Sequence, residues 1–142
     1  MKCVSSVAYS VVINGHRGDK FVPTRGLRQG DPLSPFLFLI CGEGLSSLLR
    51  LAMKRDCHKG IRVNRYGPQV SHLLFADDCI LFGEAMRRVA NIIKDILCEF
   101  KVCSGQCVNF DKSTVFFSKN TLEEDKRQAV NVLGVRRTSE PE

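Results

Sequence analysis

The sequence is poor in the features that mark disordered or fibrous proteins. Proline and glycine take only 16 of the 142 positions, 5 and 11 respectively, and no low-complexity tract or internal repeat is visible. Apolar residues make up 44% of the chain and charged residues 25%. This composition excludes collagen-like and disordered classes. It predicts one globular domain, or part of one, with enough length to bury a core.

Signals for secretion and membrane anchoring are also missing. The first residues lack a basic segment followed by an unbroken apolar core, and no apolar run approaches the length that spans a bilayer. The seven cysteines form an odd set without a C-x-x-C pair, which predicts free thiols in a reducing, intracellular compartment, nuclear or cytoplasmic. Zinc is the alternative, bound by Cys98, Cys103 and Cys107 with His58 or His72, but this spacing fits no common zinc motif.

Basic residues are in excess. The 21 Lys and Arg residues against 15 Asp and Glu give a net charge of +6 and a pI near 9.1. Such a balance favours a polyanionic partner such as nucleic acid, with a merely solvated basic face as the alternative.

Apolar periodicity and turn signals predict an α+β domain, with helices packed on one face of an antiparallel sheet. The first expected elements are a hairpin around Asn14-Gly15, with strands at 4–13 and near 21–22, and a helix over 35–54. The next are strands at 61–63 and 70–74 around a turn at 65–68, and a helix from 84 to 102 that ends at Ser104-Gly105. Strands at 108–110 and 114–117 follow, and then a last helix with a capping box of Thr121 and Glu124.

The stretch 72–82 is an apolar run interrupted by two adjacent carboxylates, Asp77 and Asp78. Branched and aromatic residues on both sides predict a hairpin with the acids at its tip. An ordinary turn is the simple explanation, because Asp bonds readily to its own backbone. However, apolar residues run right up to both acids, and two like charges repel unless a cation compensates. Carboxylates held on a rigid turn suit Mg²⁺, which takes one or two carboxylates plus substrate phosphates.

A second unusual segment precedes the first long helix. The loop at 25–31 combines two arginines, two glycines and a glutamine immediately before the predicted helix start at Ser34-Pro35. Freed backbone amides, guanidinium groups and an amide donor can hold phosphates or a base pair. A solvated loop that caps the helix is the alternative.

Four blocks in a fixed order identify a family resemblance. R-G-L-R-Q-G-D-P-L-S-P at 25–35 is followed by F-A-D-D at 75–78, S-G-Q-C-V-N-F-D-K-S at 104–113 and V-L-G-V at 132–135. Together they resemble the reverse transcriptase domain of non-LTR (LINE-type) retrotransposons, especially those of plants, over about 4–135. The resemblance implies an RNA-directed DNA polymerase fold, with the chain forming the central, palm-like part over 1–142.

The resemblance also implies a two-metal nucleotidyl transfer with Mg²⁺ as cofactor. Asp77 matches the metal-binding aspartate, and Asp78 matches its less strictly required acidic neighbour. Lys112 matches a lysine placed near the triphosphate, where it donates a proton to pyrophosphate. The implied partners are an RNA template, a DNA primer and a dNTP, with no membrane and no small-molecule cofactor.

The implied nucleic-acid and nucleotide contacts are Arg25, Arg28, Gln29, Gly30, Phe75 and Ala76. In the resemblance, the glutamine and glycine line the pocket of the incoming nucleotide, and the arginines lie near nucleic acid or triphosphate. The Phe-Ala pair lies beside the primer end, with Phe where many retroviral relatives have Tyr.

The family pattern contains parts that these residues do not match. A further metal-binding aspartate and the fingers precede the matched blocks in the family, and the thumb follows them. Asp19 and Asp31 are poor substitutes, because one falls in a hairpin turn and the other in the Gly-Asp-Pro loop. We therefore expect the isolated chain to be inactive, and poorly soluble through an unpaired sheet edge. The alternatives are a non-catalytic nucleic-acid-binding remnant and an inert retroelement relic.

Overall fold

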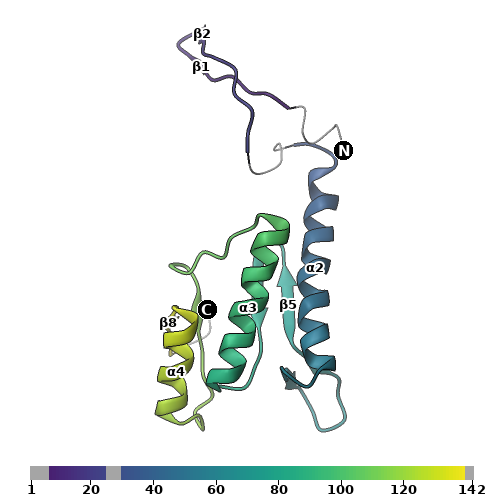
Figure 1. Ribbon diagram of the computed structural model, residues 1–142, viewed down its shortest axis with the longest axis vertical. Helices are drawn as coiled ribbons and strands as arrows, with labels where there is room; N and C mark the ends of the chain where they lie inside the picture. Colours follow the sequence, from purple (N-terminus) through teal and green to yellow (C-terminus); the bar gives the residue numbers. More distant parts are fainter. Residues whose placement is uncertain (1–6, 25–29, 140–142) are drawn as a thin grey trace. The chain divides into compact units, whose positions relative to one another are not determined.

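The structure is a computed structural model that describes residues 7–24 and 30–139 (Figure 1). It divides into two compact units, Met1–Phe38 and Leu39–Glu142.

The first unit contains the predicted hairpin. Strand β1 (Val12–Ile13) pairs with β2 (His16–Arg17) around Asn14-Gly15, whose φ angles of 50° and 83° suit a tight type I′ turn. Beyond β2 the two arms stay paired, because Tyr9 and Phe21 exchange two backbone hydrogen bonds of 2.8 Å. The turn prediction is confirmed. The second strand was predicted at 21–22, but pairing begins at His16 and Phe21 forms only an isolated bridge.

Helix α2 (Ser34–Lys54) starts within one residue of its predicted boundary and ends at the predicted position. A short turn sets its start: the Asp31 carboxylate accepts the Leu33 N–H at 2.8 Å, and the Asp31 carbonyl accepts the Ser34 N–H at 3.1 Å. The orphan amides at this helix start are thereby partly satisfied.

By length and composition, α2 could cross a membrane, which corrects the expectation that no apolar run approaches such a length. The same helix, however, has its own packing partners in the second unit. Its buried residues Leu45, Ser46 and Leu49 face the protein interior. A long apolar helix of this kind is equally typical of a protein core, so length alone carries little weight.

The core of the second unit lies between α2 and α3 (Arg87–Ser104). Leu45 and Leu49 of α2 meet Ile96 of α3, and Leu81 and Phe100 pack against this cluster. Helix α3 begins three residues after its predicted start and ends where predicted. Gly105 there takes the left-handed φ of 73° and its N–H bonds the Lys101 carbonyl.

Two antiparallel hairpins follow α2 in sequence. In the first, β3 (Ile61–Arg62) pairs with β4 (Gln69–Val70), and in the second, β5 (His72–Phe75) pairs with β6 (Asp78–Leu81). The predicted strand at 70–74 is therefore divided at Ser71 between two different partners. The approach of the chains is very close at Gly60, where a Cβ atom would lie only 2.0 Å from the Val70 carbonyl oxygen. Only glycine fits there.

The C-terminal part corrects two predictions. Residues 108–110 form no strand, and β7 (Thr114–Val115) pairs in parallel with β8 (Arg136–Arg137) after the intervening helix α4 (Glu123–Leu133). A parallel pair needs such a crossover, whereas a hairpin was expected. Figure 1 shows α4 beside α3, and the Lys94 ammonium ties the two helices by donating to the Val132 carbonyl at 2.8 Å.

The predicted capping box at Thr121 and Glu124 is wrong. The helix is preceded by Leu122 without a side-chain cap. Instead, Glu123 in its first turn binds Lys126 at 2.7 Å and Arg137 at 2.8 Å. The hydrogen bond from Lys126, followed by that from Arg137, lowers the pKa of Glu123 to about 2. This ion-pair cluster connects α4 with β8.

The predicted α+β class is confirmed. Across 7–24 and 30–139, the strands form four two-stranded pairs, three antiparallel and one parallel, and the helices are α2, α3 and α4. The predicted single sheet is thus present only as separate pairs. The hairpin β5–β6 is the pair on which the candidate site rests.

Candidate functional site

The acidic pair lies at the tip of β5–β6, as predicted. Phe75 pairs with Asp78, so Ala76 and Asp77 are the two residues of the turn. Ala76 has a φ of 50°. The residue with positive φ at the first position of a two-residue turn is usually glycine, and the same backbone conformation is strained for alanine. The paired strands must therefore hold Ala76 in this strained conformation. The conformation of the turn then positions the two acidic residues.

The two faces of this hairpin differ. Alternation along the strands puts His72, Leu74 and Leu81 on one face. That face meets α2, because the Leu74 Cδ1 atom lies 3.6 Å from the Cβ position of a residue built at Gly42, and Leu81 joins the core cluster. In Figure 1, β5 runs beside α2.

The opposite face is open. It carries Leu73, Phe75, Asp78 and Ile80, and the three apolar side chains are 53%, 82% and 55% exposed, respectively. Asp77 and Asp78 are exposed as well. An apolar surface that ends in two carboxylates is therefore presented on the side away from α2.

A polar clamp holds the base of the hairpin. His72 lies 2.8 Å from the Ser46 hydroxyl through Nε2 and 2.8 Å from the Ser71 hydroxyl through Nδ1. Both serines are buried, and the Ser71 carbonyl accepts the Phe82 N–H at 2.8 Å. Burial, and next the positive charge of Arg50, lower the pKa of His72. A neutral imidazole therefore links α2 to β5.

A second histidine, His58, is buried in the same unit. His58 is 1% exposed, and neither of its ring nitrogens has a hydrogen-bond partner in the described part of the chain. A Cβ atom at Gly83 would lie 3.1 Å from the His58 Cε1 atom and 3.1 Å from the Val89 Cγ1 atom, so the backbone at Gly83 approaches both residues closely. Burial lowers the pKa of His58, partly opposed by Glu84. The neutral ring is the form that this packing accommodates.

The donor chemistry of the tip suits Mg²⁺, because carboxylate oxygens are hard ligands. Within residues 7–24 and 30–139, however, no group of three or more His, Cys, Asp or Glu side chains is placed to hold a metal ion. In the described residues, therefore, no third such side chain joins Asp77 and Asp78. The set that was considered for zinc is likewise not gathered among these residues.

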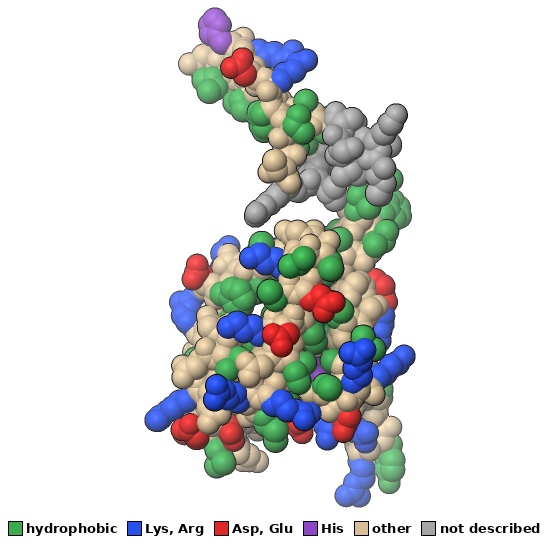
Figure 2. Space-filling view, viewed as in Figure 1, with side chains coloured by type: hydrophobic (Ala, Val, Ile, Leu, Met, Phe, Trp, Pro, Cys, Tyr) green, Lys and Arg blue, Asp and Glu red, His purple; other side chains and the backbone are tan. Residues whose placement is uncertain are grey.

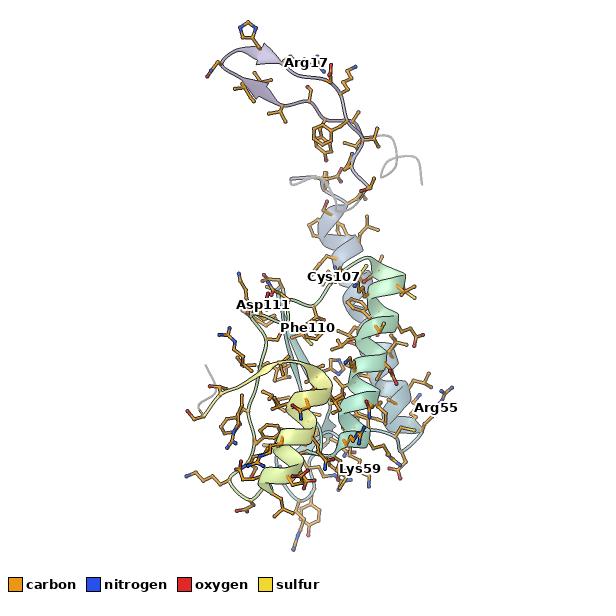
Figure 3. All side chains as sticks on the ribbon, turned by 60° about the vertical axis from the view of Figure 1, so that its left-hand side comes forward. Arg17, Arg55, Lys59, Cys107, Phe110 and Asp111 are labelled. Carbon is orange, nitrogen blue, oxygen red and sulfur yellow. The ribbon has the colours of Figure 1, made fainter. Side chains whose placement is uncertain are left out.

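Lys112 lies on a separate element from the acidic tip. It belongs to a turn in which its N–H bonds the Asn109 carbonyl at 3.2 Å, and the Ser113 N–H bonds the same carbonyl at 3.0 Å. Nearby, Arg136 donates to the carbonyl of Asp111. No hydrogen bond or ion pair in the described residues joins Lys112 to Asp77 or Asp78. Figure 3 shows Phe110 and Asp111 on this segment.

The arginine-rich loop is described only at its end. Arg25, Arg28 and Gln29 lie outside the described residues, and Gly30 has a φ of 80° with open space where a side chain would stand. Asp31 uses its carboxylate to begin α2.

The clamp is the part of the site that sequence reasoning missed. His72 was considered only as a zinc ligand, and Ser46 and Ser71 were not considered. A signal was available, because His72 stands two residues before Leu74 and so shares its packed face. A polar residue on a buried strand face needs a partner, and Ser46 supplies it from a helix 26 residues away in sequence.

The helix-backed hairpin carries its two carboxylates at the tip, where the sequence resemblance places the acidic block of the family. The comparisons agree. The family profile for reverse transcriptase (RNA-dependent DNA polymerase) matches residues 1–137. The chain therefore belongs to the reverse transcriptase family, and it is a segment of the non-LTR retroelement kind that the four blocks predicted.

Two relatives extend this result. The chain is 41% identical over 106 residues to an uncharacterized mitochondrial protein of Arabidopsis thaliana, covering 75% of this chain and 86% of that protein. It is 34% identical over 100 residues to the retrovirus-related Pol polyprotein of a type-2 retrotransposable element of Drosophila melanogaster. That match covers 70% of this chain but 8% of the polyprotein. Reverse transcriptases in general bind a nucleic-acid template, a primer and dNTPs, and use Mg²⁺.

Proposed function

We propose that Asp77 and Asp78 are the metal ligands of an RNA-directed DNA polymerase palm, contributed by this chain as a partial reverse transcriptase domain. One observation carries the proposal: the hairpin packs one face on α2 and presents Phe75, Asp78 and the Asp77 turn on the open face. Both acids are exposed to solvent there.

In this proposal each residue of the tip has a separate task. Asp77 and Asp78 would hold Mg²⁺, and their like charges would be compensated by it. Bound Mg²⁺ supplies Lewis-acid activation of the primer 3′-hydroxyl and charge neutralisation at the leaving pyrophosphate. Phe75, 82% exposed beside Asp78, would support the primer end, and the Ala76 backbone would set the turn that aims the carboxylates.

The remaining proposed contacts come from two other segments. Lys112 would protonate the pyrophosphate that leaves when the primer 3′-oxygen bonds to the α-phosphorus. Arg25 and Arg28 would bind phosphates, and Gln29 with Gly30 would line the pocket for the incoming nucleotide. Their support is the sequence resemblance together with the open backbone at Gly30.

The test is primer extension on an RNA template with Mg²⁺ and dNTPs. We expect no extension by the 142-residue chain, because two carboxylates alone complete no metal site. A longer chain that also contains the upstream aspartate should extend the primer. Asp77→Asn in that longer chain should lower the rate at least about 10³-fold, since it removes a charged ligand.

The matched control is Asp111→Asn, an exposed aspartate outside the hairpin, which should keep the rate near that of the parent. Equal extension by the parent and Asp77→Asn would overturn the metal role. Salt-sensitive RNA binding without extension by any chain would favour the non-catalytic alternative.

A further inference from the structure

The loop between β3 and β4, residues 63–68, is an exposed aromatic and basic tip. Tyr66 is 94% exposed and Val63 is 81% exposed. In the described part of the chain, neither Arg62 nor Arg65 forms an ion pair, and both are exposed. The 20 residues between Asp56 and Asp77 contain no carboxylate, whereas Lys59 and these two arginines lie within them. Within the chain segment 57–76, the positive charge of the tip therefore has no carboxylate to neutralise it.

The loop is a built structure. The Asn64 side-chain oxygen accepts a hydrogen bond from the Tyr66 N–H at 3.0 Å. The Asn64 backbone carbonyl accepts one from the Gly67 N–H at 3.3 Å. A Cβ atom at Gly67 would lie 2.8 Å from the Asn64 side-chain oxygen, so the turn closes tightly on itself. The backbone under Tyr66 is therefore ordered before any ligand arrives, which lowers the entropic cost of binding.

Neighbouring basic residues extend this surface. Figure 3 shows Arg55 and Lys59 near the end of α2, in the segment that leads into β3. Lys59 is only loosely paired with Asp56, at 3.9 Å, and Arg55 forms no ion pair among the described residues. Figure 2 shows Lys and Arg side chains at this lower end of the second unit, with Asp and Glu side chains among them.

We propose that this tip, Arg62, Arg65 and Tyr66, is a binding site for single-stranded nucleic acid, apart from the acidic hairpin tip. Arginines bind the phosphates, and the exposed tyrosine ring stacks on an unpaired base, the combination used for single strands. The positive charge of the tip favours nucleic acid over an apolar protein surface. A protein partner would have to supply carboxylates that pair with the arginines.

The inference rests on the proposed function for its ligand, the single-stranded RNA template, but its test requires no catalysis. The acidic tip and this tip lie at opposite ends of the chain segment from Gly67 to Ala76. That segment can span at most about 30 Å. A single-stranded template that is longer than this distance can therefore reach both tips.

The chain offers a direct spectroscopic probe, because it has no tryptophan and two tyrosines, Tyr9 and Tyr66. In the Tyr9→Phe chain, all tyrosine emission comes from Tyr66. Adding a short single-stranded RNA in metal-free buffer should quench that emission, and the duplex of the same sequence should quench it much less. Heparin, a polyanion without bases, should bind without the quenching.

Affinity is measured in parallel by fluorescence anisotropy of labelled RNA. Tyr66→Ala should weaken binding about tenfold through lost stacking, and Tyr66→Phe should stay within about twofold. Arg62→Gln and Arg65→Gln should each reduce the slope of log affinity against log salt by about one. Since these side chains form no described contacts, circular dichroism should show all variants folded like the parent.

Several results would overturn the proposal: no RNA binding, binding without quenching, or equal quenching by RNA and heparin. Equal affinity of Tyr66→Ala and parent would do so as well. An Asp77→Asn chain separates this proposal from the proposed function, since it should bind RNA through the tip like the parent. If the longer chain fails to extend primers but RNA still quenches the emission of Tyr66, the proposed function is wrong and the RNA-binding site is supported.

Discussion

Two hairpins of this chain are built in opposite ways. The hairpin β1–β2 has Asn14-Gly15 at its turn, two residues that accept positive φ, while its four strand residues are all exposed. The hairpin β5–β6 has Ala76 at positive φ, a poor turn residue, yet it is fastened to α2 through His72 and Leu81. The turn sequence favours the first hairpin, whereas packing against α2 stabilises the second.

The difference shows where a functional turn can come from. Because packing and the His72 clamp determine the path of β5–β6, the tip residues need not be good turn formers. Two adjacent acids, which repel each other, can then occupy the tip. The hairpin β1–β2, whose strand residues are all exposed, has no comparable packing to offset that cost.

The largest expected effect comes from removing the packing under the second hairpin. Leu49 is fully buried, so Leu49→Ala should lower the free energy of unfolding of the second unit by about 2–5 kcal/mol. Urea titration followed by circular dichroism measures it. Leu51→Ala on the same helix, at a position 43% exposed, is the control and should cost less than about 1 kcal/mol.

Hydrogen exchange should separate the hairpins in the same Leu49→Ala chain. Amides of Leu73 and Ile80 should exchange faster than in the parent, and those of Val12 and Arg17 should be unchanged. Equal acceleration in both hairpins would contradict the distinction.

A smaller effect, of opposite sign in the two hairpins, is expected at the turns. Gly15→Ala forces a side chain onto a φ of 83° and should destabilise β1–β2 by about 1 kcal/mol. Ala76→Gly relieves a φ of 50° and should stabilise β5–β6 by about 0.5–1 kcal/mol. Chemical shifts of the flanking strands report both populations.

Gly15→Asn is the control, because asparagine tolerates a positive φ and should cost less than alanine. Stabilisation by Gly15→Ala, or loss of stability in Ala76→Gly, would remove the contrast between the turns.

The smallest change is expected on mild acidification, at the base of the second hairpin. The pKa values of His58 and His72 are lowered in the folded chain, so the unfolded chain binds protons first as the pH falls below about 6.5. The second unit should be fully stable above that pH and lose stability below it. Urea midpoints across a pH series measure this.

Two variants test the assignment. His58→Leu removes a buried ring whose nitrogens are unpartnered, and should flatten the pH dependence. His16→Asn, on the exposed strand β2, should leave it as in the parent. An unchanged pH dependence in His58→Leu and also in His72→Gln would exclude both histidines as its source.

Sequence reasoning succeeded where a local signal suffices. Asn14-Gly15 predicts a tight hairpin, Gly105 predicts the end of α3, and the apolar flanks of Asp77-Asp78 predict the acidic tip. Each of these features depends on residues within a few positions of one another. The family blocks added the chemistry, which composition could not supply.

The failures involve partners far apart in sequence. Ser71 divides one apolar run between two pairings, and Val115 pairs with Arg137 across a helix. Thr121 and Glu124 match a capping box, but Glu123 is instead held by Lys126 and Arg137. Tertiary pairing overrode local preference in the two strand cases, whereas Glu123 has both a local partner, Lys126, and a distant one, Arg137. The Ser46–His72 clamp also could not be predicted from local sequence, because its two residues lie 26 positions apart.

The parallel pair β7–β8 has a consequence for the order of events during synthesis. Hairpins such as β5–β6 can close as soon as their own residues leave the ribosome, within microseconds. The β7 strand must wait until all of α4 and Arg137 have emerged, since its partner lies 22 residues downstream. At ordinary elongation rates this wait lasts on the order of a second or more. The acidic hairpin is thus the early-forming part of this unit, and the C-terminal crossover closes it last.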